Sequence, residues 1–233
     1  MPRARRRFLA KLATLVVGAA MLVVLLSVAV ILALRIVPPP VTAVMLEQHR
    51  SLRGFAYAWR GHARISATVA RAVIAAEDQR FLEHHGFDFE SMQHALDDYA
   101  AGDELRGAST ITQQVAKNLF LWSGRSFVRK GLEAYLTVLL EACWPKQRIL
   151  EVYLNVAELG SGVFGVEAAA ERFSGIPASA LTAEQAALLA AVLPNPRRLH
   201  VDNPSAYVRE RQAWILEQME LLETRGHYRG LDW

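Results

Sequence analysis

The 233-residue sequence is poor in the residues from which several common classes of site are built. Its single cysteine, Cys143, excludes an intramolecular disulfide and leaves the redox compartment open. No H-E-x-x-H, no paired C-x-x-C and no glycine-rich loop ending in G-K-[ST] occurs, which removes zinc peptidases and P-loop NTPases. S-x-x-K and K-T-G are also absent, so a penicillin-type acyl-transfer domain is not expected.

Acidic side chains are missing from the start of the chain. The formal net charge of the whole sequence is +3, but residues 1–35 contain six positive side chains and no acidic one. The rest of the chain therefore carries a formal charge of −3, which argues against a nucleic-acid-binding body. The six are Arg3, Arg5, Arg6, Arg7, Lys11 and Arg35.

One long run, from Leu12 to Leu34, has no charged residue. With a rise of ~1.5 Å per residue, a helix of this length spans a hydrocarbon core of ~30 Å. The apolar part of a secretory signal is shorter, about 7–15 residues. We therefore expect a transmembrane helix; the alternative, a cleaved signal peptide, would export the same domain. Because the arginines precede the run, the N-terminus is expected in the cytoplasm and everything after Arg35 outside it.

These features divide the chain into four segments. The expected segments are a basic cytoplasmic tail (residues 1–11), the transmembrane helix (12–34), a linker leading into the folded region (35–64) and the main domain (65–233).

After Ser66 the sequence has the periodicity of successive α-helices, and strand signals are weak. Ser66 is a candidate N-cap for the first of them, which is expected to stop near Gly86. Capping-box spacing marks two more helix starts, at Thr110–Gln113 and Thr182–Gln185. The fold class is therefore mainly α, while the stretch from Val41 to Ser66 is expected to be irregular. Other helices are expected over 89–102, 126–144, 145–158 and 205–225.

Two adjacent carboxylates, Glu77 and Asp78, interrupt the apolar pattern of the first helix. Glu77 lies on the apolar stripe, four residues after Val73 and four before Phe81. A carboxylate on a buried face costs free energy unless it is paired or protonated. Glu77 is therefore either a structural salt-bridge partner or a working group, and this stretch alone favours neither.

A polar segment followed by cations could hold an anion. A helix N-terminus offers free N–H groups to a phosphate or pyrophosphate, and lysines and arginines nearby would add full charges. The alternative is a solvated basic face with Arg129 and Glu133 as an i,i+4 pair, and for any single cation this alternative is favoured. The set comprises Ser109, Thr110, Gln113, Gln114, Lys117, Arg125, Arg129 and Lys130.

A third candidate, Glu151, has the apolar neighbours Leu150 and Leu154, so we expect it to be partly buried. The alternative is a buried ion pair with an arginine, which is compatible with a functional site. Two carboxylates far apart in sequence, with a phosphate-sized basic group between them, suggest sugar transfer from a phosphate leaving group.

Five segments in order resemble the signatures of the peptidoglycan glycosyltransferases, glycosyltransferase family 51. EDQRFLEHHG at residues 77–86 fits the first pattern, E-D-x-x-F-x-x-H-x-G. The resemblance covers residues 65–200 and implies a lysozyme-like helical fold of two lobes, with a small jaw lobe near the membrane. Since no transpeptidase module follows, it implies the monofunctional, membrane-anchored form. The other segments are GASTITQQVAKN (107–118), RKGLE (129–133), KQRILEVYLN (146–155) and GVFGVEAAAERF (162–173).

The resemblance implies polymerisation of lipid II by inverting transfer of the growing glycan from undecaprenyl pyrophosphate to the GlcNAc 4-hydroxyl of lipid II. Glu77 would be the general base, Glu151 would assist the donor site or orient a cation, and Asp78 would hold the helix or a cation. By the same likeness, Lys117, Arg125 and Arg129 would stabilise the pyrophosphate. The cleft would be shaped by Ser109, Thr110, Gln113 and Gln114, with His84, Lys130 and Glu133 as structural supports.

No cofactor is evident in the sequence, and a divalent cation, Mg²⁺ or Mn²⁺, is left open. The expected partners are lipid II, the nascent glycan strand, membrane lipid and other cell-wall synthesis or division proteins, with no nucleic acid. The expected location is the bacterial inner membrane, crossed once. For the apolar run Leu119–Trp122, core packing is favoured over a membrane-dipping edge.

Two other functions fit part of the pattern. A lysozyme-like glycan hydrolase would use a buried Glu77 with Glu151 as its partner. A non-catalytic scaffold of wall synthesis would need neither a carboxylate on an apolar face nor five intact signatures. The basic set argues for a phosphate leaving group, which glycan hydrolysis does not need.

Overall fold

The chain is mostly α-helical and divides into two compact units. The computed structural model describes residues 3–52, 54–100, 109–124, 126–231 and 233. The first unit is Met1–Pro38 and the second is Pro39–Trp233. Residues 39–64, expected as a linker, therefore belong to the second compact unit.

The first unit consists of one helix, α1 (Arg3–Leu34). Its part from Leu9 to Leu34 has a mean hydropathy of 3.0 and is long and apolar enough to cross a membrane. The helix expected over residues 12–34 is confirmed as a helix.

The second unit contains the other elements. In order they are α2 (Ala43–Leu52), β1 (Ala56–Tyr57), η1 (His62–Arg64), α3 (Ala67–Glu77), α4 (Phe89–Ala100), α5 (Ile111–Phe120), α6 (Phe127–Cys143), α7 (Lys146–Val156), β2 (Glu158–Gly160), β3 (Val163–Phe164), α8 (Val166–Ser174), η2 (Ala178–Ala180), α9 (Ala183–Ala191) and α10 (Ala206–Arg225).

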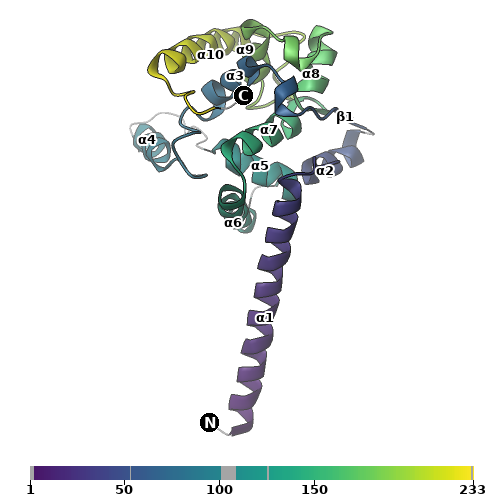
Figure 1. Cartoon of the computed structure of the whole chain (residues 1–233), viewed down its shortest axis with the longest axis vertical. Coiled ribbons are helices and arrows are strands. Elements are labelled where there is room, and N and C mark those ends of the chain that lie inside the picture. Colours follow the sequence, from purple (N-terminus) through teal and green to yellow (C-terminus); the bar gives the residue numbers. More distant parts are fainter. Residues whose placement is uncertain (1–2, 53, 101–108, 125, 232) are drawn as a thin grey trace. The chain divides into compact units, whose positions relative to one another are not determined.

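The helices of this unit pack in two groups (Figure 1). Helices α3, α9 and α10 contact one another, while α5 packs against α2, α6 and α7. A small sheet of order β1-β3-β2 joins parallel β1–β3 to antiparallel β2–β3, and α8 packs against it. The two-lobed, mainly α arrangement expected from the sequence is confirmed.

The predicted helix starts are confirmed by their hydrogen bonds. Both capping boxes form, with the threonine side chain bonded to the N3 amide and the glutamine side chain bonded back to the N-cap amide. Each satisfies two N–H groups that a helix start leaves without a partner. Three serine side chains cap the starts of α3, α6 and α10: Ser66, Ser126 and Ser205.

Two expectations were wrong. Helix α3 ends at Glu77 instead of continuing towards Gly86, because Asp78 leaves the helical conformation with φ −161° and ψ 74°. The turns that follow place Phe81 fully in the core. The stretch 41–66 is also not irregular throughout, since it contains α2, before which the Thr42 hydroxyl accepts a hydrogen bond from the Met45 amide at 3.2 Å.

The apolar run Leu119–Trp122 begins in the last turn of α5, and two of its four residues are buried. Leu119 and Leu121 are 7% and 5% exposed, whereas Trp122 is 44% exposed. Core packing, the favoured reading of this run, holds for both leucines.

Candidate active site

Glu77, the last residue of α3, lies where the two helix groups meet. Its side chain is 13% exposed. Its Oε2 accepts a hydrogen bond of 2.9 Å from Nε2 of Gln114 on α5. Its Oε1 lies 3.6 Å from Nη2 of Arg211 on α10. One carboxylate is thus held from both sides.

Burial raises the pKa of Glu77 above its ordinary value. The hydrogen bond from Gln114 and the positive charges of Arg211 and Lys117 pull this pKa back down, while the neighbouring Asp78 raises it. A carboxylate whose pKa is raised towards neutrality is a stronger base than an exposed one. The setting therefore suits a proton acceptor.

Tyr153 on α7 fixes the orientation of the Gln114 amide. The Tyr153 hydroxyl donates to Gln114 Oε1 at 3.1 Å, so the amide NH₂ is turned towards Glu77. Tyr153 is 1% exposed, and burial raises its pKa well above 10. The phenol therefore stays protonated and keeps its donor role.

A cavity of about 410 Å³ opens beside this hydrogen-bonded chain. Gln114 and Lys117 of α5 and Tyr153 of α7 line it, together with residues of α2 and the loop 193–197. Cavities of this size hold small organic ligands or parts of larger ones. The amide that is bonded to Glu77 and the Lys117 side chain thus line one space.

Lys117 is a half-buried cation, and none of the described residues holds its ammonium group in place. Burial lowers its pKa, and the charges of Arg129 and Lys130 lower it further, whereas Glu133 and Glu77 raise it. None of the described residues forms a hydrogen bond or ion pair with its ammonium group. A cation left unpaired beside a cavity favours an anionic ligand.

The cations of the third segment gather around Glu133, which is 3% exposed. Arg129 Nη1 donates to Glu133 Oε2 at 2.5 Å, and Lys130 bonds the other oxygen. Lys130 also reaches the hydroxyl of Ser109 at 3.4 Å. The i,i+4 pair of Arg129 and Glu133, which the sequence left open, is present. With Lys117 included, the single Glu133 carboxylate faces three cations, so positive charge is in excess.

Several predicted site residues hold the fold instead of facing the cavity. Thr110 and Gln113 form the capping box of α5, and the Thr110 hydroxyl also donates to the Gly86 carbonyl at 2.7 Å. Their role is to fix the start of the helix that carries Gln114. Arg125 lies outside the described residues.

Glu151 lies in a separate buried cluster. Its Oε2 is 2.7 Å from Nη1 of Arg148, and its Oε1 accepts from the His62 amide at 3.0 Å. The Arg148 guanidinium in turn lies 5.1 Å from the Trp59 ring. The structure shows the buried ion pair with an arginine, and it does not bring Glu151 into the hydrogen-bonded group of Glu77.

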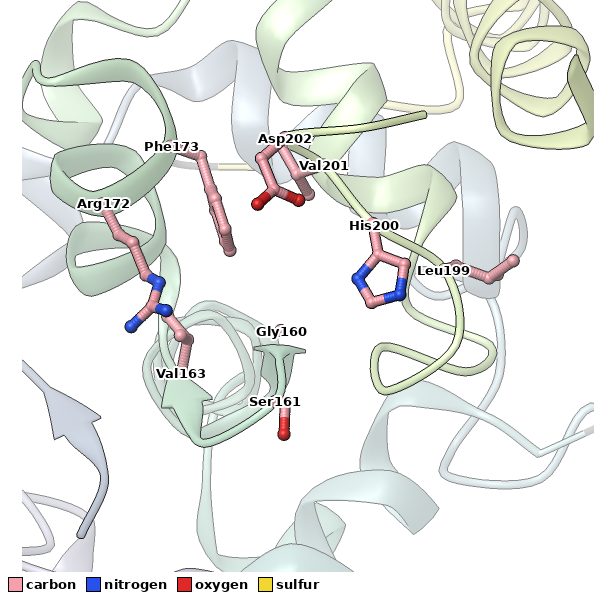
Figure 2. Close-up of a pocket in the computed structure, with 9 residues that line it drawn as sticks. All are labelled: Gly160, Ser161, Val163, Arg172, Phe173, Leu199, His200, Val201 and Asp202. Carbon is pink, nitrogen blue, oxygen red and sulfur yellow. The ribbon is translucent and has the colours of Figure 1, made fainter. Parts of the chain in front are cut away.

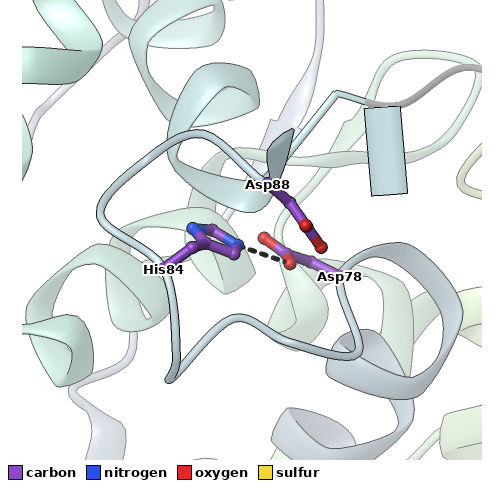
Figure 3. Close-up of side chains that lie close together, drawn as sticks. All are labelled: Asp78, His84 and Asp88. Carbon is purple, nitrogen blue, oxygen red and sulfur yellow. Dashed lines mark hydrogen bonds and ion pairs between the residues drawn. The ribbon is translucent and has the colours of Figure 1, made fainter. Parts of the chain in front are cut away.

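Asp78, His84 and Asp88 bring their ligand atoms within 4.8 Å of one another (Figure 3). The His84 Nδ1 accepts from the Gly86 amide, so Nε2 carries the proton and donates to Asp78 Oδ1 at 2.8 Å. Asp78 Oδ2 accepts from the Ile111 amide at 3.0 Å. Because a protonated ring nitrogen cannot bind a metal, this arrangement does not fit a divalent cation. Asp78 instead ties the turn after α3 to the start of α5.

A second, smaller cavity of about 100 Å³ lies at the sheet and α8 (Figure 2). Its lining includes Arg172, His200 and Asp202, all exposed. None of the predicted site residues that the structure describes lines it.

Two contributors to the site were not predicted. Tyr153 lies in KQRILEVYLN, where only Glu151 was singled out, and its place in the fourth segment was the available signal. Arg211 lies outside all five segments, and no pattern in the sequence marks it.

Comparison with known proteins agrees with this geometry. The family model described as Transglycosylase matches residues 47–220. A biosynthetic peptidoglycan transglycosylase of Xanthomonas campestris pv. campestris (strain B100) is 49% identical, over 97% of this chain and 93% of the relative. Proteins with the same name from Klebsiella oxytoca and Escherichia coli O127:H6 are 56% and 58% identical, covering 84% and 79% of both chains. The chain belongs to the transglycosylase family and is a glycosyltransferase enzyme.

Proposed function

We propose that this protein is a peptidoglycan glycosyltransferase that polymerises lipid II into glycan strands. The observation that carries the proposal is the Glu77 carboxylate, 13% exposed, which is hydrogen-bonded to Gln114; Gln114 and Lys117 both line the cavity. The relatives share the name of biosynthetic peptidoglycan transglycosylase, which is the same reaction class.

In the proposed reaction, Glu77 accepts the proton of the GlcNAc 4-hydroxyl of lipid II as that oxygen attacks C1 of the terminal MurNAc of the growing chain. The new bond is the β-glycosidic C1–O bond. The bond that breaks joins C1 to the lipid pyrophosphate, which leaves with the electron pair, so α inverts to β. A raised pKa makes Glu77 strong enough to take this proton in the transition state.

The pyrophosphate gains negative charge as it leaves. Lys117, whose ammonium has no bonded partner among the described residues, is placed to receive that charge. Arg129 lies near Lys117 in the group around Glu133, and its positive charge would also stabilise the leaving pyrophosphate. By likeness to the family, Arg125 belongs to the same set. Positive charge already in place needs no rearrangement during the reaction.

A glycan hydrolase is less well supported. The second carboxylate that it would use, Glu151, is occupied by Arg148 and by the His62 amide. The unpaired cation beside the base also has no task in glycan hydrolysis, whereas a pyrophosphate leaving group would engage it.

The protein is proposed to lie in the bacterial inner membrane with its N-terminus in the cytoplasm and Pro39–Trp233 outside. The apolar helix α1 and the six N-terminal positive side chains support this orientation. Lipid II and the nascent glycan would be its ligands, and membrane lipid and other wall-synthesis proteins its further partners.

The decisive experiment compares wild type with Glu77→Gln, using the purified full-length protein and labelled lipid II. Glutamine keeps the size of the side chain but cannot accept the proton, so we expect a loss of polymer of at least about a hundredfold. Glu217→Gln, an exposed position on α10, is the matched control and should polymerise normally. Equal polymer from wild type and Glu77→Gln would rule out Glu77 as the base, and shortening of preformed glycan would favour the hydrolase.

A further inference from the structure

Arg211 contacts the proposed base from an element outside the five signature segments. It lies on α10, whereas Glu77 ends α3. Its Nη2 donates to the Ala76 carbonyl at 3.3 Å and lies 3.6 Å from Glu77 Oε1. One guanidinium nitrogen therefore holds the last turn of α3 and faces the carboxylate at the same time.

The placement of Arg211 is poorly explained by stability alone. Its side chain is 22% exposed, and its Nε is buried with no hydrogen-bond partner among the described residues. A buried donor without a partner destabilises a fold. A neutral residue at this position would avoid that cost, so the charge beside Glu77 calls for another reason.

We propose that Arg211 is a positioning residue of the glycosyltransferase reaction, holding Glu77 ionised and leaving Oε1 free to receive the proton of the sugar hydroxyl. This inference rests on the proposed function, in which Glu77 is the general base. A separation of 3.6 Å is too long for a hydrogen bond but short enough for strong attraction between charges. Oε2, in contrast, is occupied by the Gln114 amide.

Other groups act on the same carboxylate. They are Asp78, which follows it in the chain, Lys117 and Gln114 of α5, and Tyr153 of α7. Helix α9, which also packs against α3, supplies none of these. Arg211 is thus the positive charge that α10 brings to Glu77. Lys117, the positive charge from α5, also lines the cavity and is proposed to bind the pyrophosphate.

The test measures polymerisation of labelled lipid II by full-length protein between about pH 5.5 and 9. Arg211→Met removes the charge but keeps a long side chain, so the Glu77 carboxylate becomes harder to ionise. We expect turnover at pH 7 to fall about tenfold and to recover as the pH is raised, because the acid limb of the profile moves upward. Arg211→Lys keeps a positive charge and removes the unpartnered Nε, so its acid limb should stay near that of wild type.

Arg209→Met is the matched control. Arg209 lies on the same helix, is exposed, and bonds only Gln212 among the described residues, so both activity and pH profile should be unchanged. Each profile is compared with its own maximum, so partial loss of folded protein changes its height but not its position.

Two results would overturn the inference. One is an Arg211→Met profile that runs parallel to wild type or matches it; the other is an Arg211→Lys profile shifted as far as that of Arg211→Met. The proposed function is separated from this inference by Glu77→Gln, measured in parallel. Full polymer from Glu77→Gln would show that Glu77 is not the general base. An inactive Glu77→Gln together with an unshifted Arg211→Met profile would contradict only the positioning role of Arg211.

Discussion

At the scale of single residues, the orientation of one amide determines how the proposed base is held. Gln114 could present either its oxygen or its nitrogen to Glu77, and the oxygen would repel the carboxylate. The ionised carboxylate can only accept and therefore requires the nitrogen, and the Tyr153 hydroxyl supports this orientation because it donates to the amide oxygen. The hydrogen bond from Tyr153 thus acts on Glu77 through Gln114.

We therefore expect Tyr153→Phe to lower turnover. The lost hydrogen bond corresponds to about 1 kcal/mol, or roughly fivefold in rate, because the amide is no longer held in one orientation. The measurement is the kcat of lipid II polymerisation, with Tyr207→Phe, an exposed tyrosine of α10, as the control. If Tyr153→Phe keeps the wild-type kcat, the hydroxyl does not position Gln114.

A second prediction at this scale concerns pH. The proposed base must be ionised, so activity should be lost as pH falls through the raised pKa of Glu77. Lys117 must be charged, so activity should be lost again as pH rises through its lowered pKa. The profile of kcat/KM is therefore expected to be bell-shaped, with limbs set by these two groups.

Lys117→Arg separates the two limbs. An arginine stays protonated throughout this range, so the alkaline limb should move to higher pH while the acid limb stays, although the altered shape lowers the rate. Lys146→Arg, at a lysine paired with Glu141, should leave both limbs in place. An unchanged alkaline limb in Lys117→Arg would assign that limb to another group.

At the scale of elements, the start of α5 determines where two residues of the site lie. This helix carries both Gln114 and Lys117, and four hydrogen bonds fix its first turn: the two of the capping box, the bond from Thr110 to the Gly86 carbonyl, and the bond from the Ile111 amide to Asp78. Asp78 and Gly86 belong to the turns after α3. The end of one helix therefore sets the start of the next, and with it the distance between base and amide.

The two capping boxes provide a matched comparison. Thr110→Ala and Thr182→Ala each remove an N-cap side chain, and each should lower the free energy of unfolding by about 1 kcal/mol. Thr110→Ala should cost more, since it also frees the buried Gly86 carbonyl, and should also reduce kcat because α5 shifts. Denaturant unfolding and polymerisation assays check this; equal kcat in both variants would show that the cap of α5 does not affect the site.

At the scale of the whole molecule, an apolar helix precedes a unit with its own core. Leucines and valines along α1 are exposed, as at Leu15 and Leu25, which are 70% and 63% exposed. The helix is long and apolar enough to cross a membrane, where lipid would cover these side chains.

The proposed orientation predicts the outcome of proteolysis. Protease added to spheroplasts should digest Pro39–Trp233, because that unit is expected outside the cytoplasm, and should leave a short N-terminal fragment protected. A cytoplasmic protein probed in the same cells is the control for intact membranes. Protection of the C-terminal unit would overturn the orientation.

Local sequence alone determined the capped starts of α3, α5, α6, α9 and α10, the apolar span and the five signature segments, because caps and periodicity depend on residues a few positions apart. It identified Glu77, Gln114 and Lys117 as candidates for the same reason. The tertiary structure decided which candidates meet. It ended α3 at Glu77, because Asp78 bonds the Ile111 amide and His84, and it placed Glu151 with Arg148. Only the tertiary structure identified Arg211 as a neighbour of Glu77, since a charge pair between α3 and α10 forms only once both helices are packed.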